Sequence, residues 1–488
     1  GTSILADAGW IEWNGGDGME AVVQPLNDQW MIGSWQFGTR QRTQDGGQTR
    51  NGIGSPENGN GDWQAPLMFD PNLQMKVYHC MDSLYVSDEF GTGWYSVGSP
   101  SFTGNIKIGV VAENNSNNII LVRNSDIELS QDGGQTWSSI AAGLPGHSVT
   151  DVAFDPKDDN TIVVTYNRYQ SDNQKVYISH DMGQTWANIT YNLGDMPIRT
   201  VVIDHTDASN IYVGAEIGVY YKPMNSNTWV LYNPNLPNTT VRDLEIQYGS
   251  NTLRAATWGR GLWEYTLVGR NDFPAVLTTS ITDPPTLETP KPGTPQDVTS
   301  VISYGNNLTS VYVKWSTDDP TFDSTIVMNN TIDSTWQTVT PLPAYPAGTK
   351  LYFKVYAVGS NGDTTETYKF MYTVRSLEYC YSDGNMSYGT GITLVEFAGI
   401  SRASGKTQAY TDYTLTDSAT VVVSNNYNLR NNLNTDGNYA IYSKVWIDWN
   451  QDFDFDDVGE EYDLGFAQNT ANGSTNLSPL MIAVPANA

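Results

Sequence analysis

An octet with the pattern Ser-x-Asp-x-Gly-x-Thr-Trp recurs along the first half of the chain at a nearly constant spacing. Copies lie at 43–50, 87–94, 130–137 and 179–186. The last two are complete, whereas Arg50 replaces the tryptophan in the first copy and Glu89 the aspartate in the second. The acidic positions are 44, 43 and 49 residues apart. This period is the length of a four-stranded propeller blade, so the repeat predicts a β-propeller.

The residue types in the octet suit a structural role within a hairpin turn. An aspartate there accepts backbone N–H bonds, glycine adopts positive φ, and tryptophan covers the turn. We therefore assign a structural role, and no catalytic one, to Asp45, Asp132, Asp181, Trp137 and Trp186.

The repeat resembles the Asp-box (BNR) propellers of sialidases, sortilin-type receptors and xyloglucanases. In that family the boxes lie on the rim, away from the central site. Residues 241–267 form a last propeller-like segment without a box, which the resemblance implies is closed by a strand from the N-terminal side. Residues 1–267 give roughly six blade lengths. We therefore expect the propeller to be incomplete at its N-terminus.

Composition and patterning predict an all-β chain of several modules. Gly 44, Trp 15 and Tyr 29 accompany only 16% charged residues, as turns and pleated faces require. A Pro/Thr-rich stretch at 268–296 is predicted to be a linker. Alternating segments at 310–315 and 347–357 follow, and their spacing is similar to that of immunoglobulin-like or fibronectin type III-like modules. We expect a sandwich at 297–375 that acts as a spacer.

A last module is predicted at 376–488, with a second β-sandwich-like fold. The segment 445–460, with the preceding Tyr410-Thr-Asp-Tyr413, resembles the GEVED domain of secreted Bacteroidota proteins. The Gly-Glu-Val-Glu-Asp stretch that closes this family's domain does not occur by residue 488. We therefore expect the module to be incomplete at its C-terminus, and the usual partner of Cys380 to lie beyond it. Cys80 is in a different module, and the pairing of the two cysteines stays open.

Alternating oxygen donors make this acidic segment a candidate calcium loop. Its donors are Asp448, Asn450, Asp452, Asp454, Asp457 and Glu460. Hard oxygen ligands two residues apart suit a loop that curls around calcium. The segment departs from an EF-hand because Phe453 occupies the glycine position and a strand precedes it. We expect calcium in a stabilising role, with a solvated acidic turn as the alternative.

The charge balance restricts the partners. With 53 acidic and 25 basic residues the net charge is -28, which disfavours nucleic acid and anionic membrane surfaces. No apolar run is long enough to predict a membrane span. The acidic excess suits an extracellular protein or one on the outer cell surface, where weak calcium sites fill.

The signals for catalysis are weak. No context matches the sialidase set of three arginines, a Tyr–Glu pair and an acidic aspartate. A glycosidase of the xyloglucanase kind requires two carboxylates placed by geometry, and the candidates are Asp17, Glu216 and Asp243. Each also fits an ordinary turn or rim position. The sequence favours a protein that is not an enzyme, and a glycoside hydrolase if it is one.

Recognition is the function that the sequence favours. Sugar rings stack on flat amphipathic side chains, and candidate tryptophans are Trp10, Trp13, Trp30, Trp35, Trp258 and Trp263. Module strings of this kind in Bacteroidota belong to adhesins or large surface proteins exported by type IX secretion. We therefore expect a surface protein, within a larger assembly, that binds a glycan or protein ligand. A polysaccharide glycosidase and a structural stalk or filament component are the alternatives.

Overall fold

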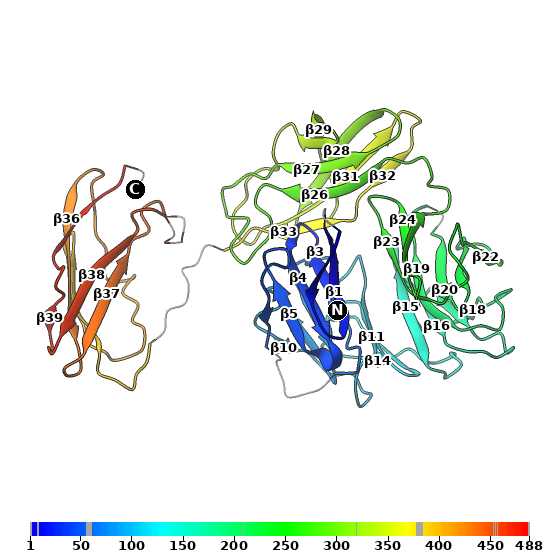
Figure 1. The fold of residues 1–488 in the computed structure, drawn as a ribbon, viewed down its shortest axis with the longest axis horizontal. Coiled ribbons are helices and arrows are strands. Elements are labelled where there is room, and N and C mark those ends of the chain that lie inside the picture. Colours follow the sequence, from blue (N-terminus) through cyan, green and yellow to red (C-terminus); the bar gives the residue numbers. More distant parts are fainter. Residues whose placement is uncertain are drawn as a thin grey trace. The chain divides into compact units, whose positions relative to one another are not determined.

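The computed structural model describes residues 2–6, 9–54, 61–207, 209–318, 320–376, 384–451, 453, 455 and 457–486. The chain divides into two compact units, residues 1–375 and residues 376–488 (Figure 1). The regular elements described are β-strands, apart from the short 3-10 helix η1 (Gln36–Gly38). No helix in the described part of the chain has the length and apolar character needed to cross a bilayer.

Six successive sheets in the first unit have the strand order of propeller blades. Blade 1 is β3 (Gly18–Gln24), β4 (Asn27–Trp35), β5 (Arg40–Thr43) and β6 (Asn51–Gly52). Blade 2 is β7 (Leu67–Phe69), β8 (Val77–Cys80), β9 (Leu84–Ser87) and β10 (Tyr95–Ser96). Blade 3 is β11 (Ile108–Val111), β12 (Ile119–Arg123), β13 (Asp126–Ser130) and β14 (Ser138–Ser139).

The remaining blades repeat this antiparallel order. Blade 4 is β15 (Val149–Asp155), β16 (Asp158–Tyr166), β17 (Val176–Ser179) and β18 (Ala187–Asn188). Blade 5 is β19 (Ile198–Ile203), β20 (Ile211–Ala215), β21 (Gly218–Lys222) and β22 (Val230–Leu231). Blade 6 has three strands, β23 (Val241–Gln247), β24 (Thr252–Thr257) and β25 (Gly261–Thr266).

The first strand of each blade is the inner strand of the propeller. Inner strands of successive blades contact each other from β3 through β7, β11, β15 and β19 to β23. Apolar side chains fill the space between blades, as where Ile120 and Val122 of blade 3 pack with Val152 and Val164 of blade 4. The predicted propeller is confirmed.

The N-terminal strands differ from the expected closure. β1 (Thr2–Ala6) and β2 (Gly9–Asn14) pair with each other in their own two-stranded sheet, and within the described residues neither joins blade 6. Strands that follow each other closely in sequence tend to pair, and that local pairing replaces the long-range closure.

The Asp boxes close the turns between the third and fourth strands. Asp132 Oδ1 accepts hydrogen bonds from Ser130 Oγ at 2.8 Å and from the Thr136 N–H at 2.9 Å. The Thr136 hydroxyl donates to Oδ2 at 2.6 Å. Asp45 and Asp181 accept the equivalent bonds in their own turns. Both oxygens of each carboxylate are therefore engaged by their own turn.

The box tryptophans link their turn to the preceding segment. Trp137 Nε1 donates to the carbonyls of Gly134 and Gly98, each at 3.1 Å. Trp186 Nε1 donates to the Ile140 carbonyl at 2.8 Å. Gly134 has φ +93°, and a Cβ there would meet Val97 at 3.0 Å, which explains the glycine at this position.

Eight strands complete the first unit as one continuous hydrogen-bonded sheet around a shared core, which we call the sandwich. They are β26 (Ala275–Ile281), β27 (Val298–Ser303), β28 (Leu308–Thr317), β29 (Ser324–Ile332), β30 (Thr335–Thr338), β31 (Lys350–Gly359), β32 (Thr364–Glu366) and β33 (Phe370–Thr373). Val311, Val313, Phe353 and Val355 are buried in the shared core. The segment expected to be a linker contains β26, which pairs with β27. Val276 and Ile281 of β26 lie in this core. The Pro/Thr-rich composition on either side of β26 is the reason that the sequence did not predict a strand there.

The sandwich is docked on the propeller, which differs from the expected spacer role. The Val276 N–H donates to the Gly249 carbonyl at 2.7 Å, and a Cβ on Gly249 would lie 2.3 Å from the Val276 oxygen. Gln74 of blade 2 donates to the Lys369 carbonyl at 2.7 Å and accepts from the Met371 N–H at 3.0 Å. Buried polar bonds of this kind fix one orientation.

The second unit is a separate β-module. Its strands are β34 (Gly391–Phe397), β35 (Ile400–Ala403), β36 (Asn426–Asn434), β37 (Ala440–Trp446), β38 (Glu461–Gln468), β39 (Gly473–Ser474) and β40 (Leu480–Ala483). β36 is central, pairing with β34, β39 and β40, while β37 pairs with β38. Leu429, Trp449, Leu464 and Ile482 form its buried core.

The box geometry predicts a pH-dependent contribution to stability. The hydrogen bonds from Thr136 and Ser130 lower the pKa of Asp132 from 3.8 to about 2. A depressed pKa stabilises the folded state above about pH 4, and this contribution is lost as pH falls toward 2. We expect Asp132→Asn to lower the melting temperature at neutral pH, with a difference from wild type that shrinks between pH 4 and 2. Asp126→Asn, at an exposed position on the same blade, is the control, and an equal effect from it would contradict the assignment.

Candidate functional site

Four of the acidic residues on the inner strands of the propeller form one group. They are Glu20 on β3, Asp151 on β15, and Asp243 and Glu245 on β23. The charges of Asp243, Asp151 and Glu20 all act on Glu245, although blades 1, 4 and 6 contribute them. We call this group the axial acid cluster.

Burial and mutual repulsion make two of these acids weak. Desolvation by the surrounding protein, with the neighbouring Asp243 and Asp151 charges, raises the pKa of Glu245 to about 7, although the residue is exposed by surface area. Burial also raises the pKa of Asp151 to about 7, against hydrogen bonds from the backbone N–H groups of Val201 and Val152, both at 2.8 Å. The cluster therefore holds both protonated and ionised carboxyl groups near neutral pH, which is a requirement of acid–base chemistry.

Bulges at the start of the inner strands place these acids. The register of β15 shifts between Val149 and Asp151, and that of β23 shifts between Val241 and Asp243. A bulge adds one residue to its strand and turns a side chain in a new direction. The segments 149–152 and 241–244 both read Val-x-Asp followed by an apolar residue. That shared pattern was the available signal for Asp151, which sequence reasoning missed together with Glu20 and Glu245.

The three candidate catalytic acids are not brought together. Asp243 belongs to the axial acid cluster, whereas Asp17 lies in an exposed bend before β3. Glu216 is held by Arg199, whose Nε donates at 3.1 Å, and by the Thr240 hydroxyl at 2.8 Å. Burial acts to raise the pKa of Glu216, but these hydrogen bonds outweigh it and lower the pKa. Glu216 is thus engaged in a local ion pair.

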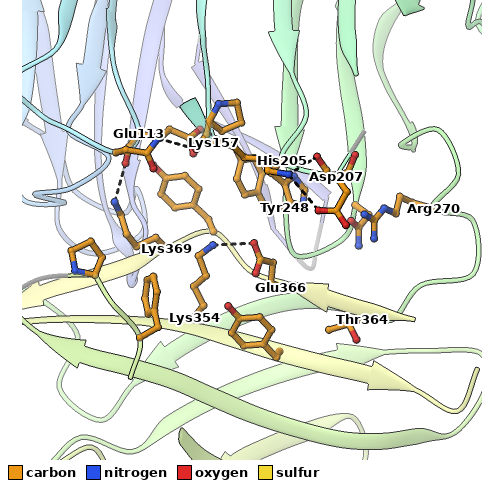
Figure 2. Close-up of a pocket in the computed structure, with 18 residues that line it drawn as sticks. Glu113, Lys157, His205, Asp207, Tyr248, Arg270, Lys354, Thr364, Glu366 and Lys369 are labelled. Atoms are coloured by element: carbon orange, nitrogen blue, oxygen red, sulfur yellow. Dashed lines mark hydrogen bonds and ion pairs between the residues drawn. The ribbon is translucent and has the colours of Figure 1, made fainter. Parts of the chain in front are cut away.

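A cavity of about 470 Å³ lies between the propeller and the sandwich (Figure 2). We call it the junction pocket. Most of its propeller residues follow the ends of four inner strands: Glu113 follows β11, Lys157 follows β15, His205 follows β19 and Tyr248 follows β23. Arg270 lies between β25 and β26. The sandwich supplies Lys354 and Tyr356 of β31, Glu366 of β32, and Tyr368 and Lys369. The pocket therefore exists because the sandwich docks at this end of the propeller.

A hydrogen-bonded and stacked array forms one wall of the junction pocket. Tyr248 Oη donates to Glu113 Oε1 at 2.7 Å, and the His205 ring stacks on Tyr248 with centroids 4.0 Å apart. Burial raises the pKa of Glu113 to about 7 although Tyr248 and Lys369 act to lower it. Burial lowers the pKa of His205 to about 4, so the ring is neutral at pH 7. Its Nδ1 is buried and has no hydrogen-bond partner among the described residues.

Two lysines of the sandwich line the pocket, and one of them, Lys369, joins the sandwich to the propeller. Lys369 Nζ donates to Asn72 Oδ1 and to the Glu113 carbonyl, the latter at 2.9 Å. Lys354 Nζ pairs with Glu366 Oε1 at 2.9 Å. Figure 2 shows both lysines reaching from the sandwich into the pocket. Lys369 thus holds two neutral oxygens of the propeller rather than a carboxylate.

The acidic loop of the second unit is described in part. Asp448 Oδ2 accepts from the Phe453 N–H at 2.9 Å, and Asn450 Nδ2 donates to Asp457 Oδ2 at 2.8 Å. Glu460 Oε1 accepts from the Trp449 N–H at 2.8 Å, while the buried Oε2 has no hydrogen-bond partner among the described residues. Asp452 and Asp454 lie outside those residues. Within them, no group of three or more His, Cys, Asp or Glu side chains is placed to hold a metal ion.

Among the residues that the structure describes there is no cysteine pair, and one of the six candidate sugar-binding tryptophans is largely exposed. Cys80 is a buried free thiol whose pKa is raised by burial, and Cys380 lies outside the described residues. Trp13 and Trp30 are buried in the core, and the Trp10 side chain is not described. Trp258 is 72% exposed, with the Arg242 guanidinium 5.5 Å from its ring centroid. Of the six candidate tryptophans, Trp258 is the one described side chain that is largely exposed.

Two family models match parts of the chain. The model described as sortilin, neurotensin receptor 3, matches residues 82–217, which include three of the four octets. The GEVED domain model matches residues 442–488. These matches confirm the resemblance of those two segments, while the fibronectin type III resemblance and the bacterial lineage stay predictions. Comparison with curated proteins found no match.

Solved structures with similar folds include glycosidases and a propeller of another kind. The GH74 xyloglucanase from Xanthomonas campestris is 12% identical, over 86% of this chain and 79% of its own, with a TM-score of 0.42. The GH74 enzyme from Niastella koreensis is 13% identical, over 93% and 74%, with a TM-score of 0.35. YCF48 from Cyanidioschyzon merolae is 13% identical, over 66% and 94%, with a TM-score of 0.36. Similarity this low carries no argument about activity.

Proposed function

We propose that this chain is a recognition protein of the extracellular space or outer cell surface, and that it binds a glycan in the junction pocket. The observation that carries the proposal is the cavity of about 470 Å³ between two docked modules. Small-molecule sites have volumes of roughly 300–1,000 Å³ and combine apolar walls with a few polar groups. The junction pocket has this size and this mixture.

The lining of the pocket suits a sugar. Tyr356 and Phe322 of the sandwich and Tyr248 of the propeller supply aromatic surface. The Tyr356 ring is held in place by stacking on Tyr312, with centroids 5.1 Å apart. Sugar rings stack on such faces while their hydroxyl groups bond to polar side chains.

The test is retention of glycans by the full 488-residue chain. We expect the protein to retain at least one member of a polysaccharide and oligosaccharide array, and Tyr356→Ala to weaken that binding by ~2–10-fold, since one aromatic contact contributes about 0.5–1.5 kcal/mol. Tyr169→Ala, at a site with a 68% exposed ring on blade 4, is the matched control. An array with nothing retained would refute the proposal and favour the structural stalk. Equal binding by Tyr356→Ala would place the site elsewhere.

The axial acid cluster supports a second candidate function, a polysaccharide glycosidase. Glycoside hydrolysis uses one protonated and one ionised carboxyl group, and Glu245 and Asp243 are neighbours whose charges interact. On this proposal the wild-type protein releases new reducing ends from a polysaccharide, and Asp243→Asn slows the release by ~10²–10⁴-fold. Asp17→Asn, in the exposed bend, is the control. The absence of any new reducing ends across a polysaccharide panel would exclude this function.

We also propose calcium as a stabilising ligand of the acidic loop. The buried and unpartnered Oε2 of Glu460 supports this proposal, because a buried carboxylate oxygen requires a partner. Calcium at millimolar concentration is expected to raise the melting temperature of the second unit, with magnesium giving a smaller rise. Glu460→Gln is expected to remove the response, whereas Glu396→Gln on β34 retains it. An unchanged melting temperature in calcium would refute the proposal.

A further inference from the structure

We infer that the ligand of the junction pocket is a carboxylate-bearing sugar, with Arg270 as the side chain that receives its carboxylate. This inference rests on the proposed glycan-binding function and specifies its ligand. Four basic and three acidic side chains line the pocket: Lys157, Arg270, Lys354 and Lys369, with Glu113, Asp207 and Glu366. The whole chain has 53 acidic residues against 25 basic ones. The pocket therefore reverses the charge balance of the molecule.

The basic side chains of the pocket differ in the hydrogen-bond and ion-pair partners that they have within the protein. Lys369 donates to the Asn72 side chain and the Glu113 carbonyl, and Lys354 pairs with Glu366. Lys157 contacts the Thr206 carbonyl at 3.2 Å and Asp207 at 3.4 Å. The ammonium groups of these lysines already bond to protein atoms, so they hold the walls of the pocket in place.

Arg270 differs from the three lysines, because its guanidinium has neither a hydrogen bond nor an ion pair with any described residue. Its guanidinium lies over the Phe273 ring, 4.3 Å from the centroid, and in the part of the chain that the structure describes no carboxylate pairs with it. The guanidinium has five N–H donors in a planar arrangement that matches a carboxylate. A half-buried arginine without an acid, on the wall of a cavity, is placed to pair with an acidic ligand.

His205 lies close to Arg270 and completes the polar wall. The positive charges of Arg270 and Lys354 both act on the His205 ring, and Figure 2 shows His205 and Arg270 on the same side of the pocket. The His205 ring, neutral at pH 7, lines the same pocket as Arg270. The His205–Tyr248 stack offers the adjoining flat surface. A charged group and a ring-shaped body are thus accommodated side by side.

The acidic side chains of the pocket favour an anion of single charge. Glu113 and Glu366 lie on the same walls as the basic groups, so a doubly charged phosphate is repelled more strongly than a carboxylate. The aromatic lining and the volume of about 470 Å³ favour a sugar ring over an extended peptide. A uronic acid has both features, a ring and one carboxylate.

The experiment compares an acidic sugar with its uncharged ester. Calorimetry on the full chain measures binding of a galacturonate or glucuronate oligosaccharide and of the methyl ester of the same oligosaccharide. We expect the acid to bind at least about tenfold more tightly, and its affinity to fall as salt concentration rises. Arg270→Gln is expected to weaken the acid by ~10–100-fold, since bonds to charged groups contribute about 1.5–3 kcal/mol, and to leave the ester nearly unchanged.

Controls separate this inference from the proposed function. Arg254→Gln, at an arginine that is 56% exposed and paired with Glu264 outside the pocket, is expected to bind the acid as wild type does, and both variants are checked for an unchanged melting temperature. Lys157→Gln is a second pocket variant, with a smaller expected loss. Equal affinity for acid and ester, both weakened by Tyr356→Ala, would overturn the inference and leave the proposed function standing. Full binding by Arg270→Gln, or tighter binding of a sulfated sugar or an acidic peptide, would also overturn it. No binding by any sugar would overturn both.

Discussion

The buried ammonium group of Lys369 is the interaction on which the architecture of the first unit depends. It reaches from the sandwich into the propeller and donates to Asn72 of blade 2 and to the Glu113 carbonyl of blade 3. A hydrogen bond to a charged group contributes about 1.5–3 kcal/mol, and a buried ammonium without partners is strongly unfavourable. The sandwich therefore has one favourable position on the propeller, and that position encloses the junction pocket.

The inner strands of the propeller carry both candidate sites. Their initial bulges direct Asp151 and Asp243 into the axial acid cluster, and their last residues lead into the loops that bear Glu113, His205 and Tyr248. Glu113 belongs to the junction pocket and its charge also acts on Glu245. The ionisation state of Glu113 in the junction pocket thus affects the pKa of Glu245 in the axial acid cluster. The Asp boxes, by contrast, use their carboxylates within their own turns and serve the outer part of each blade.

Local patterns predicted the propeller, and long-range contacts had to come from the structure. The octet is a complete local motif, since every partner of Asp132 lies within four residues of it. Docking of the sandwich joins Lys369 to Asn72, 297 positions away, and no periodicity marks such a pair. The strand β26 was hidden for a similar reason, because its core partners are provided by the following strands. The acid cluster required the bulges, which change the direction of a side chain without changing the apolar pattern.

Amide hydrogen exchange in Lys369→Met measures the docking most directly. The Met371 and Val276 N–H groups donate across the junction to Gln74 and to the Gly249 carbonyl, so they report on contact between the two modules. We predict that Lys369→Met accelerates exchange at these two amides and leaves the Asp-box amides of Gly134 and Gly183 protected, while Lys107→Met, at a half-exposed surface lysine, changes neither group. Unchanged protection of Met371 and Val276 in Lys369→Met would contradict the account.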